Sequence, residues 1–504
     1  QGKGVVYLVG AGPSDAELIT VKGKRLLEEA DVIVYDRLVG SSVLSYGNNE
    51  AEYIDVGKRS GFHPIPQEEI NKILAAEAEK GGKIVRLKGG YPLVFGRGAE
   101  EAEYLNAQGI AFEIVPGITS AVSVPAYLGI PVTHRDMASS FHVVTAHKKD
   151  GSFPDISYDA LVKGGGTLVF LMGVHTVKDV AEGLLKSNMP PETPAAVLER
   201  GTTARQRKIK GTIADIARKA LEEKVQSPAI ILVGQAAGED QMEWYDKRPL
   251  AGKKFVVTRP REQKDKLSAL LREKGAEVLE MPSILIKPKE DQSMLSSALD
   301  KISSYDWIVF TSPGGVRIFF EELRKQKRDI RILGGCKIAA IGAGTNRALE
   351  ERGLFCDLMP EIYDGVSLGR ALFDVLSGGE HILIPRAALG NQELIRILEG
   401  KPDIRVDDVA VYETCHERWQ LVPVKEMIEN GEISWAVFTS ASTVRGFAKA
   451  LPDTGIKGLK AACIGEQTAK AARSLGMDVY VADKADIESL VRLVIKQQKG
   501  GRHG

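Results

Sequence analysis

A glycine-rich loop near the start of the chain is the first stretch whose residues could bind a ligand. In VVYLVGAGPSDAELIT, Gly10 and Gly12 occupy the first two positions of a G-x-G-x-x-G dinucleotide fingerprint. Asp15 stands in place of the third glycine, and Pro13 removes an N–H that a pyrophosphate would use. An acidic residue, Asp36, follows at about the spacing that the fingerprint requires. A dinucleotide site and a plain tight turn therefore both stay open for this loop alone.

The elements expected around this loop are those of an α/β protein. Apolar runs such as VVYLVG, DVIVYD, GTLVFLMG and AIILVGQ alternate with amphipathic stretches, and most end in glycine, proline or a polar residue. This pattern is typical of mostly parallel sheets with buried strands, whose carboxyl ends open into ligand-binding loops. Two further glycine-rich loops, RLKGGYPLVFGRGAEE and VPGITSAVSVPAYLGIPVTHR, follow strands of this kind.

The second half contains an internal repeat in permuted order. WIVFTSPGGVRIFF at Trp307 is repeated as WAVFTSASTVRGFA at Trp435, and AAIGAGTNRALEERG is repeated as ACIGEQTAKAARSLG. FVVTRP near Arg259 and ILIPRA near Arg386 form a weaker pair. FVVTRP comes long before the other repeated segments of its copy, whereas ILIPRA follows those of its own copy. We therefore predict two related lobes, in which the chain begins lobe A, builds lobe B and returns to lobe A. EMPSILIKP and VAVYET are the expected crossings, which would form a hinge beside a cleft.

Composition narrows the class of protein. A chain of 504 residues predicts three or four compact units. The 67 basic and 67 acidic residues balance, which argues against a mainly electrostatic nucleic-acid binder. The sequence has no apolar run long enough to span a membrane, and its four cysteines form no C-x-x-C pair. We expect a cytoplasmic protein. A periplasmic-type binding protein would share the two-lobe pattern but would need a signal peptide, and we see no such segment.

Taken together, the motifs of the first half resemble the tetrapyrrole methylase family over about residues 3–238. In family order they are GAGPSDAELIT, YDRLV, VGKR, the GGYP loop, VPGITS, LMG and ERGTT followed by RQR. Within the family, the similarity is closest to uroporphyrinogen-III C-methyltransferases. The resemblance implies a two-lobe tetrapyrrole methylase fold for residues 1–240, with lobes at about 1–134 and 135–240. A dinucleotide-dependent oxidoreductase is the alternative for this half.

The second half resembles the uroporphyrinogen-III synthase family over about residues 250–497, through VVTRP, the paired FTS and IG-x-x-T segments, and VYET. The resemblance implies that residues 250–504 form two lobes with flavodoxin-like parallel sheets, joined by a two-strand hinge. Lobe A would take residues 252–284 and 413–497, and lobe B residues 288–410.

The two resemblances together imply a fused, bifunctional enzyme of tetrapyrrole biosynthesis. It would cyclise hydroxymethylbilane to uroporphyrinogen III with inversion of ring D. It would then methylate C2 and C7 with two S-adenosylmethionine molecules, which gives precorrin-2 for sirohaem or cobalamin. The partners implied are small tetrapyrroles and a second copy of the chain, bound through the methyltransferase half, with no nucleic acid and no membrane.

The methylase resemblance implies a cleft for S-adenosylmethionine, which leaves as S-adenosylhomocysteine. Its contacts would come from Pro13, Gly89, Gly90, Tyr91, Val94, Thr119, Ser120, Met172 and Gly201. The family assigns Asp36 as the base and Lys58 as the proton donor. The substrate is an octacarboxylate, so four arginines are candidates to bind it: Arg37, Arg59, Arg97 and Arg135. Without the family, Asp36 reads as an acid that caps a turn, and Lys58 as a solvated loop residue.

One departure from the family pattern is important. The family loop usually reads Gly-Gly-Asp-Pro, but here Tyr91 replaces the aspartate. The phenol is larger than the carboxylate and neutral at pH 7. We therefore hypothesise weakened affinity for S-adenosylmethionine, with an impaired methyltransferase and mainly synthase activity as the alternative function.

The synthase resemblance implies no cofactor, and no metal site is expected in either half. The family suggests Tyr412 in VYET as an acid that aids loss of the substrate hydroxyl. Hydroxyl residues in loops at strand ends are candidates to bind the substrate carboxylates: Thr311, Ser312, Thr345, Thr439, Ser440 and Thr468. Capping of the following helix is the commoner use of such residues, and the two uses are compatible.

Overall fold

Four five-stranded sheets organise the chain. A computed structural model describes residues 3–36, 39–48, 51–57, 65–145, 155–171, 176–259, 266–282, 285–362, 364–388, 392–415, 422–451 and 455–500. Two compact units are present, Gln1–Ser283 with Leu421–Gly504, and Ile284–Gln420. Three sheets belong to the first unit and one to the second. Among the described helices, none is long and apolar enough to cross a membrane.

The first sheet is wholly parallel, in the order β3-β2-β4-β1-β5. Its strands are β1 (Val5–Gly10), β2 (Val32–Tyr35), β3 (Glu52–Asp55), β4 (Lys83–Lys88) and β5 (Phe112–Val115). Its helices are η1 (Ala16–Leu18), α1 (Val21–Glu29), α2 (Ser41–Leu44), α3 (Gln67–Glu79) and α4 (Gly98–Ala107). The next helix, α5 (Ser120–Tyr127), follows β5 but packs on the second sheet. Apolar side chains of the strands are buried on both faces of the sheet. The loops that follow β1, β2, β4 and β5 therefore open at one edge.

The second sheet, in the order β6-β7-β10-β8-β9, is mixed. Its strands are β6 (Phe141–Thr145), β7 (Thr167–Leu171), β8 (Pro194–Glu199), β9 (Arg207–Thr212) and β10 (Ala229–Val233). Its helices are α6 (Tyr158–Gly164), α7 (Val177–Lys186), α8 (Ile216–Glu222) and η3 (Gln235–Gly238). Only β6 and β7 pair in parallel; the β7–β10, β10–β8 and β8–β9 pairs are antiparallel. The expectation of mostly parallel strands is therefore wrong for this sheet, because buried strands of either kind have the same apolar pattern.

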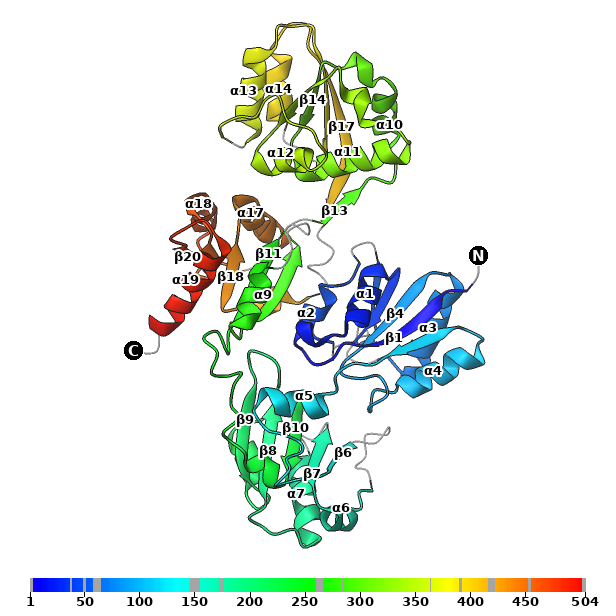
Figure 1. The fold of residues 1–504 in the computed structure, drawn as a ribbon, viewed down its shortest axis with the longest axis vertical. Coiled ribbons are helices and arrows are strands. Elements are labelled where there is room, and N and C mark those ends of the chain that lie inside the picture. The colour runs from blue at the N-terminus through cyan, green and yellow to red at the C-terminus, as the bar shows by residue number, and fades with distance from the viewer. Residues whose placement is uncertain are drawn as a thin grey trace. The chain divides into compact units, whose positions relative to one another are not determined.

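The third sheet is wholly parallel and joins segments from both ends of the second half. Its strands are β11 (Lys254–Arg259), β12 (Glu277–Pro282), β18 (Trp435–Phe438), β19 (Lys460–Cys463) and β20 (Asp478–Val481). Its helices are α9 (Lys266–Glu273), α16 (Val424–Glu429), α17 (Ala441–Ala450), α18 (Glu466–Ser474) and α19 (Ile487–Gly500). In the order β12-β11-β18-β19-β20, green β11 lies beside orange β18 (Figure 1).

The fourth sheet forms the core of the second unit, in the order β13-β17-β16-β14-β15. Its strands are β13 (Leu285–Pro288), β14 (Trp307–Phe310), β15 (Lys337–Ala340), β16 (His381–Ala387) and β17 (Arg405–Cys415). Its helices are α10 (Ser293–Asp300), η4 (Ile302–Ser304), α11 (Pro313–Lys325), η5 (Ile330–Leu333), α12 (Ala343–Glu350), α13 (Gly365–Val375) and α14 (Glu393–Glu399). β13 pairs antiparallel with β17, whereas the other pairs are parallel.

The third and fourth sheets repeat one strand order. The order β12-β11-β18-β19 in the third sheet corresponds to β17-β16-β14-β15 in the fourth. In the place of β20, the fourth sheet has an isolated parallel bridge between Ala339 and Leu358. The two FTS segments follow β14 and β18, and FVVTRP and ILIPRA begin in β11 and β16. The permutation of the repeat therefore changes the order along the chain without changing the order in the sheet.

The segment between the two halves packs against α5 through two aromatic residues, Trp244 and Tyr245. Trp244 Nε1 donates a hydrogen bond to the Ala126 carbonyl at 2.8 Å. The ring of Tyr245, which is 4% exposed, lies 4.8 Å from the ring of Tyr127. The guanidinium of Arg248 lies over both linker rings. These contacts give the segment an ordered path across α5.

Candidate active sites

Glycines bring three loops of the first sheet into contact at its carboxyl edge. Gly12 N donates to Gly90 O at 3.1 Å, and Gly90 N donates to Gly12 O at 2.7 Å. A Cβ added to Gly117 would lie 2.1 Å from Gly90 O and 2.7 Å from Gly10 Cα. Only glycine allows the backbones to come this close. We call the meeting point of Gly10, Gly12, Gly90 and Gly117 the loop junction.

Three other residues expected at a cofactor site, Pro13, Thr119 and Gly201, lie beside the loop junction or on a loop tied to it. Pro13 follows Gly12, and Thr119 Cα lies 3.8 Å from where a Cβ of Gly90 would stand. Gly201 belongs to the loop between β8 and β9, and its Cβ would lie 2.3 Å from Val124 Cγ1 on α5. That loop is also tied to the first loop, because Ser14 N donates to Thr202 Oγ1 at 3.1 Å.

The residues beside the junction form local turns. Tyr91 and Val94 are half-buried and close a turn, in which Val94 N donates to Tyr91 O at 3.0 Å. Gly89 precedes them at the end of β4. Thr119 caps α5 by accepting a hydrogen bond from Ala121 N at 3.3 Å, and Ser120 is the first residue of the helix.

Asp36, the expected base, belongs to a buried cluster of charges. It follows β2, and Arg86 Nη2 on neighbouring β4 lies 3.1 Å from Asp36 Oδ2. Arg86 Nε and Lys88 Nζ both bind Glu101 Oε1 of α4, at 3.1 and 2.9 Å. Gln67 donates to the same oxygen at 3.1 Å. Arg86, Lys88 and Glu101 are each at most 5% exposed.

Sequence reasoning missed this cluster, although the strand carried a signal. In KIVRLK, two cations occupy alternate positions of a buried strand, so both point to one face of the sheet. Burial lowers the pKa of the Lys88 ammonium, and the charge of Arg86 lowers it further. A buried cation needs a partner. Glu101 on the covering helix supplies one for both.

The four arginines expected at the substrate have different outcomes. Arg97 forms a bidentate ion pair with Glu100, at 3.0 and 2.7 Å, so its guanidinium already has a partner. This side-chain hydrogen bond raises the pKa of Arg97. Arg135 is exposed, in the turn bridged by His134 and Ala138. Arg37 and Arg59 lie outside the described residues, as do the expected proton donor Lys58 and the expected cofactor contact Met172.

Hydroxyl residues follow corresponding strands of the third and fourth sheets. Thr311 and Ser312 follow β14, and Thr439 and Ser440 follow β18, all at carboxyl ends of parallel strands. Ser312 caps α11 and Ser440 caps α17, so the capping role holds for both. The equivalent pair of threonines, on α12 and α18, is buried instead: Thr345 is 2% and Thr468 4% exposed. Burial leaves the hydroxyl groups of this pair little access to a ligand.

Tyr412 and Arg386 lie on adjacent strands of the fourth sheet. Tyr412 is 6% exposed, and its phenol oxygen is 2.7 Å from Ser312 Oγ. Burial raises the pKa of the phenol, and the hydrogen bond with Ser312 partly offsets this increase. Arg386, 3% exposed, forms a bidentate pair with Asp408 at 2.7 and 2.8 Å. The sequence pointed to Arg386 only as a marker of the repeat.

Comparison with known proteins identifies a family for each half of the chain. The model described as Tetrapyrrole (Corrin/Porphyrin) Methylases matches residues 5–217, and the model described as Uroporphyrinogen-III synthase HemD matches residues 265–492. The porphyrin biosynthesis protein HemD of Ruminiclostridium josui is 43% identical over 489 residues, which are 97% of this chain and 97% of that protein. The chain belongs to the HemD family of fused tetrapyrrole methylases and uroporphyrinogen-III synthases. It is therefore a bifunctional enzyme of tetrapyrrole biosynthesis.

Further relatives cover the methylase half of this HemD family member. The S-adenosyl-L-methionine-dependent uroporphyrinogen III methyltransferase of Methanosarcina barkeri is 53% identical over 234 residues, which are 46% of this chain and 91% of that protein. The crystal structure of uroporphyrin-III C-methyl transferase from Thermus thermophilus, complexed with S-adenyl homocysteine, is 40% identical. That similarity covers 47% of this chain and 99% of the other, with a TM-score of 0.41.

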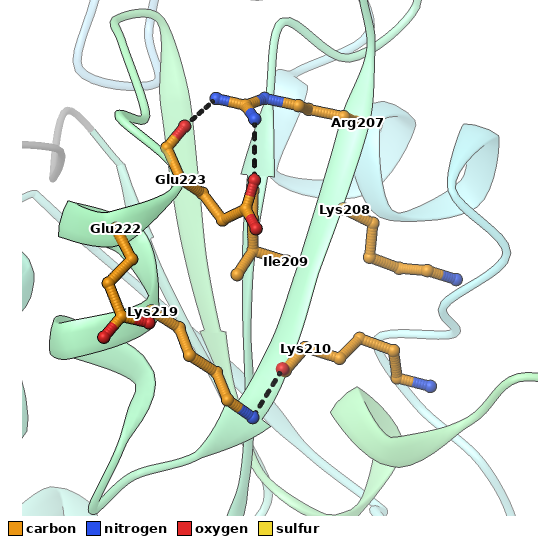
Figure 2. Close-up of a pocket in the computed structure, with 7 residues that line it drawn as sticks. All are labelled: Arg207, Lys208, Ile209, Lys210, Lys219, Glu222 and Glu223. Carbon is orange, nitrogen blue, oxygen red and sulfur yellow. Dashed lines mark hydrogen bonds and ion pairs between the residues drawn. The ribbon is translucent and has the colours of Figure 1, made fainter.

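A hollow elsewhere on the methylase half has a different character. It lies on β9 and α8, and Figure 2 shows the residues that line it: Arg207, Lys208, Ile209, Lys210, Lys219, Glu222 and Glu223. The cationic side chains that line it bind carboxylate and carbonyl oxygens of the protein itself. Arg207 binds Glu223, for example, and Lys219 donates to the Lys210 carbonyl (Figure 2). Lys208 and Lys210 also donate to backbone carbonyls. The hollow includes none of the residues expected at either active site, and we assign it no role.

Proposed function

We propose that this protein converts hydroxymethylbilane to uroporphyrinogen III and then to precorrin-2. The synthase half would close the macrocycle with inversion of ring D. The methylase half would methylate C2 and C7, using two molecules of S-adenosylmethionine, on the route to sirohaem or cobalamin. The loop junction supports the proposal, because Gly90 belongs to it and the expected contacts Pro13 and Thr119 lie beside it, with Asp36 at the end of a neighbouring strand of that sheet.

The residues at the loop junction fit S-adenosylmethionine. Gly12 and Gly90 have φ of +69° and +64°, a conformation that side chains rarely adopt, so the edge presents bare backbone. Pro13 offers no N–H, which suits a cofactor without a pyrophosphate. Pro13, Gly89, Gly90, Tyr91, Val94, Thr119, Ser120 and Gly201 would hold the cofactor, together with Met172. The bound cofactor supplies a methyl group on a cationic sulfur.

Asp36 would take up the proton that the pyrrole loses. Arg86 holds one oxygen of this carboxylate at 3.1 Å, and Glu101 holds Arg86, so the base is positioned from β4 and α4. Positioning of this kind accounts for much of an enzyme's effect on a bimolecular transfer. Lys58 would donate a proton, and Arg37, Arg59, Arg97 and Arg135 would bind the substrate's carboxylates. For Arg97 this requires release from Glu100.

In the synthase half, Tyr412 would act as an acid on the hydroxyl of hydroxymethylbilane. The bond between carbon and oxygen breaks, the bonding pair leaves with the oxygen, and the phenol's proton completes a water molecule. Thr311, Thr439 and Ser440 would bind substrate carboxylates. The hydroxyl of Ser312 already contacts the Tyr412 phenol, and Thr345 and Thr468 are buried in the first turns of their helices. This half is proposed to need no cofactor and no metal.

The test is an assay of the full chain with hydroxymethylbilane, with and without S-adenosylmethionine, followed by absorbance and mass spectrometry of the oxidised products. We expect uroporphyrin III without the cofactor and dimethylated products with it. Uroporphyrin I alone would contradict the synthase function. Uroporphyrin III without methylated product would contradict the methylase function and support the alternative in which Tyr91 impairs this half.

The effect of Tyr91 on the cofactor can be tested separately. Tyr91 is the third residue after β4, next to Gly90 of the loop junction. A carboxylate there would attract the cationic sulfur of S-adenosylmethionine, which a neutral phenol does not. We expect calorimetric titration to show tighter binding to Tyr91→Asp than to the native chain. S-adenosylhomocysteine, whose sulfur is neutral, is the control ligand and should gain less. Equal gains for both ligands would contradict the charge argument.

We also propose a cytoplasmic homodimer that forms through the methylase half. Three of the cysteines, Cys336, Cys356 and Cys463, are free thiols, which supports a reducing compartment. Exposed apolar residues on the first half, including Leu93, Phe95 and Met137, support a contact with a second copy. Light scattering after size-exclusion chromatography should give twice the chain mass of 54.6 kDa. A single-chain mass would contradict the dimer.

A further inference from the structure

An irregularity in β17 sets the direction of Tyr412. Arg386 of β16 pairs with Ala410, but the next residue, Ala387, pairs with Tyr412, so Val411 is an extra residue in β17. Regular strands send successive side chains to opposite faces. Here Val411 and Tyr412 both enter the hydrophobic cluster beneath α11, as a bulge permits. The bulge therefore turns the phenol toward the start of α11.

The first turn of α11 is held against the end of β16. A Cβ on Gly315 would lie 2.7 Å from the Pro385 carbonyl oxygen, so only glycine allows this approach. Ser312, the N-cap, accepts a hydrogen bond from Gly315 N at 3.0 Å. The same Ser312 Oγ lies 2.7 Å from the phenol oxygen of Tyr412. The helix cap Ser312 and the phenol that the bulge orients are therefore in direct contact.

The hydroxyl of Ser312 can donate one hydrogen bond to Tyr412 while it caps α11. A hydroxyl has one proton to donate and accepts at its lone pairs. Gly315 N–H takes a lone pair, so the proton of Ser312 remains available for the phenol oxygen. Once Tyr412 has given up its proton, it has none to donate, and Ser312 must then be the donor. The positive end of α11 lies beside the same oxygen and favours negative charge there.

We propose that Ser312 is a positioning residue for the proposed acid, and that it stabilises the phenolate that Tyr412 becomes when it protonates the departing hydroxyl. This inference rests on the proposed function of Tyr412. The proton that leaves with water is returned to the phenolate from the pyrrole carbon that loses a proton after ring closure. Ser312 keeps its own proton throughout.

The repeat shows why this role is particular to one lobe. Ser440 occupies the equivalent position after β18 and caps α17 in the same way, with Thr443 completing a capping box. Its hydroxyl contacts Ser442 Oγ at 2.9 Å, whereas that of Ser312 contacts the phenol. The cap is thus common to both lobes, and the contact with a tyrosine is a feature of the second unit.

The test is a double-mutant cycle on the full chain, with the rate of synthase turnover as the readout. We expect Ser312→Ala to lower kcat about 10- to 100-fold with little change in KM, because a donor to a developing charge is lost. Ser312→Thr keeps the hydroxyl and should stay within about threefold of the native kcat. In a Tyr412→Phe background, Ser312→Ala should have no further effect on kcat.

Asp364→Ala is the matched control for loss of a helix cap. Asp364 caps α13 by accepting from Ser367 N at 2.7 Å, and α13 packs on the face of the fourth sheet opposite α11. It should lower the thermal midpoint as Ser312→Ala does while kcat stays native. If Tyr412→Phe keeps the native kcat, the proposed acid fails, and this inference with it. If Tyr412→Phe is slow but Ser312→Ala lowers kcat equally in both backgrounds, only the inference is overturned.

Discussion

At the scale of single residues, the methylase half is distinguished by charges that are buried and yet paired. Glu101 is fully buried and binds both Arg86 and Lys88, and Arg86 in turn binds Asp36. Removal of one member of such a group leaves the others charged and without compensation, which costs more than the pair contributes. The cluster therefore links the stability of the first sheet to the placement of the proposed base.

The change Glu101→Gln tests this link. We expect it to destabilise the methylase half by about 3–5 kcal/mol, because Arg86 and Lys88 lose their shared carboxylate. The neighbouring Glu100→Gln is the matched control. Its pair with Arg97 is well exposed, so the loss should be about 1 kcal/mol or less. Hydrogen exchange of the β4 amides at increasing urea concentrations measures the loss of stability in each variant. Equal losses in the two variants would contradict the argument from burial.

At the scale of elements, strand, loop and helix start form one unit that recurs through the synthase half. Each FTS loop leaves a buried strand and ends in a serine that caps the next helix. The same loop exposes hydroxyl and N–H groups at the carboxyl edge of the sheet. How closely the helix approaches the sheet then depends on small residues in its first turn.

Two helical glycines test how much a close approach of the helix to the sheet contributes to stability. Gly315→Ala should destabilise the second unit by about 1–3 kcal/mol, because its Cβ would meet the Pro385 carbonyl at 2.7 Å. Gly344→Ala in α12 should instead stabilise it by about 0.5 kcal/mol, since the added Cβ meets only a side-chain atom at 3.9 Å. Urea midpoints of the two variants give the signs. A stabilising Gly315→Ala would show that α11 can move away from β16.

At the scale of the whole molecule, alkaline stability depends on buried and half-buried tyrosines in several parts of the fold. Burial raises the pKa of Tyr35 to about 12, with a further increase from the charge of Asp55. Tyr158 is raised to about 12 by burial and by Asp179. Burial and a hydrogen bond with Asp407 raise the pKa of Tyr305 as well. An unfolded tyrosine has a pKa of about 10, so the folded chain keeps these protons to higher pH.

The sign of the pH dependence follows from these shifts. Below about pH 10, both states keep the phenol protons and stability does not change through these groups. Between about pH 10 and 12, the unfolded state loses protons that the folded state retains. Each such phenol then lowers stability by about 1.4 kcal/mol per pH unit. The urea midpoint should fall over this range, and Tyr35→Phe should make the fall shallower. An unchanged slope would show that Tyr35 ionises equally in both states.

The fold class and the family could be read from the sequence, because both rest on local patterns. Apolar strands that end in glycine loops predicted the α/β class, and motifs such as GAGPSD and VGKR kept their order along the chain. The repeat at Trp307 and Trp435 also predicted two related lobes. The sheets confirm a shared strand order, because such segments carry their own strand and helix signals.

The tertiary structure alone decided strand direction and side-chain partnership. The antiparallel β8 and β10 have the same apolar pattern as parallel strands, so periodicity could not distinguish them. Arg97 was expected at the substrate but binds Glu100, and Thr345 is buried. The contact between Ser312 and Tyr412 joins residues 100 positions apart through a bulge that no motif marks. Local composition determines which elements form, whereas partners distant in sequence depend on how those elements pack.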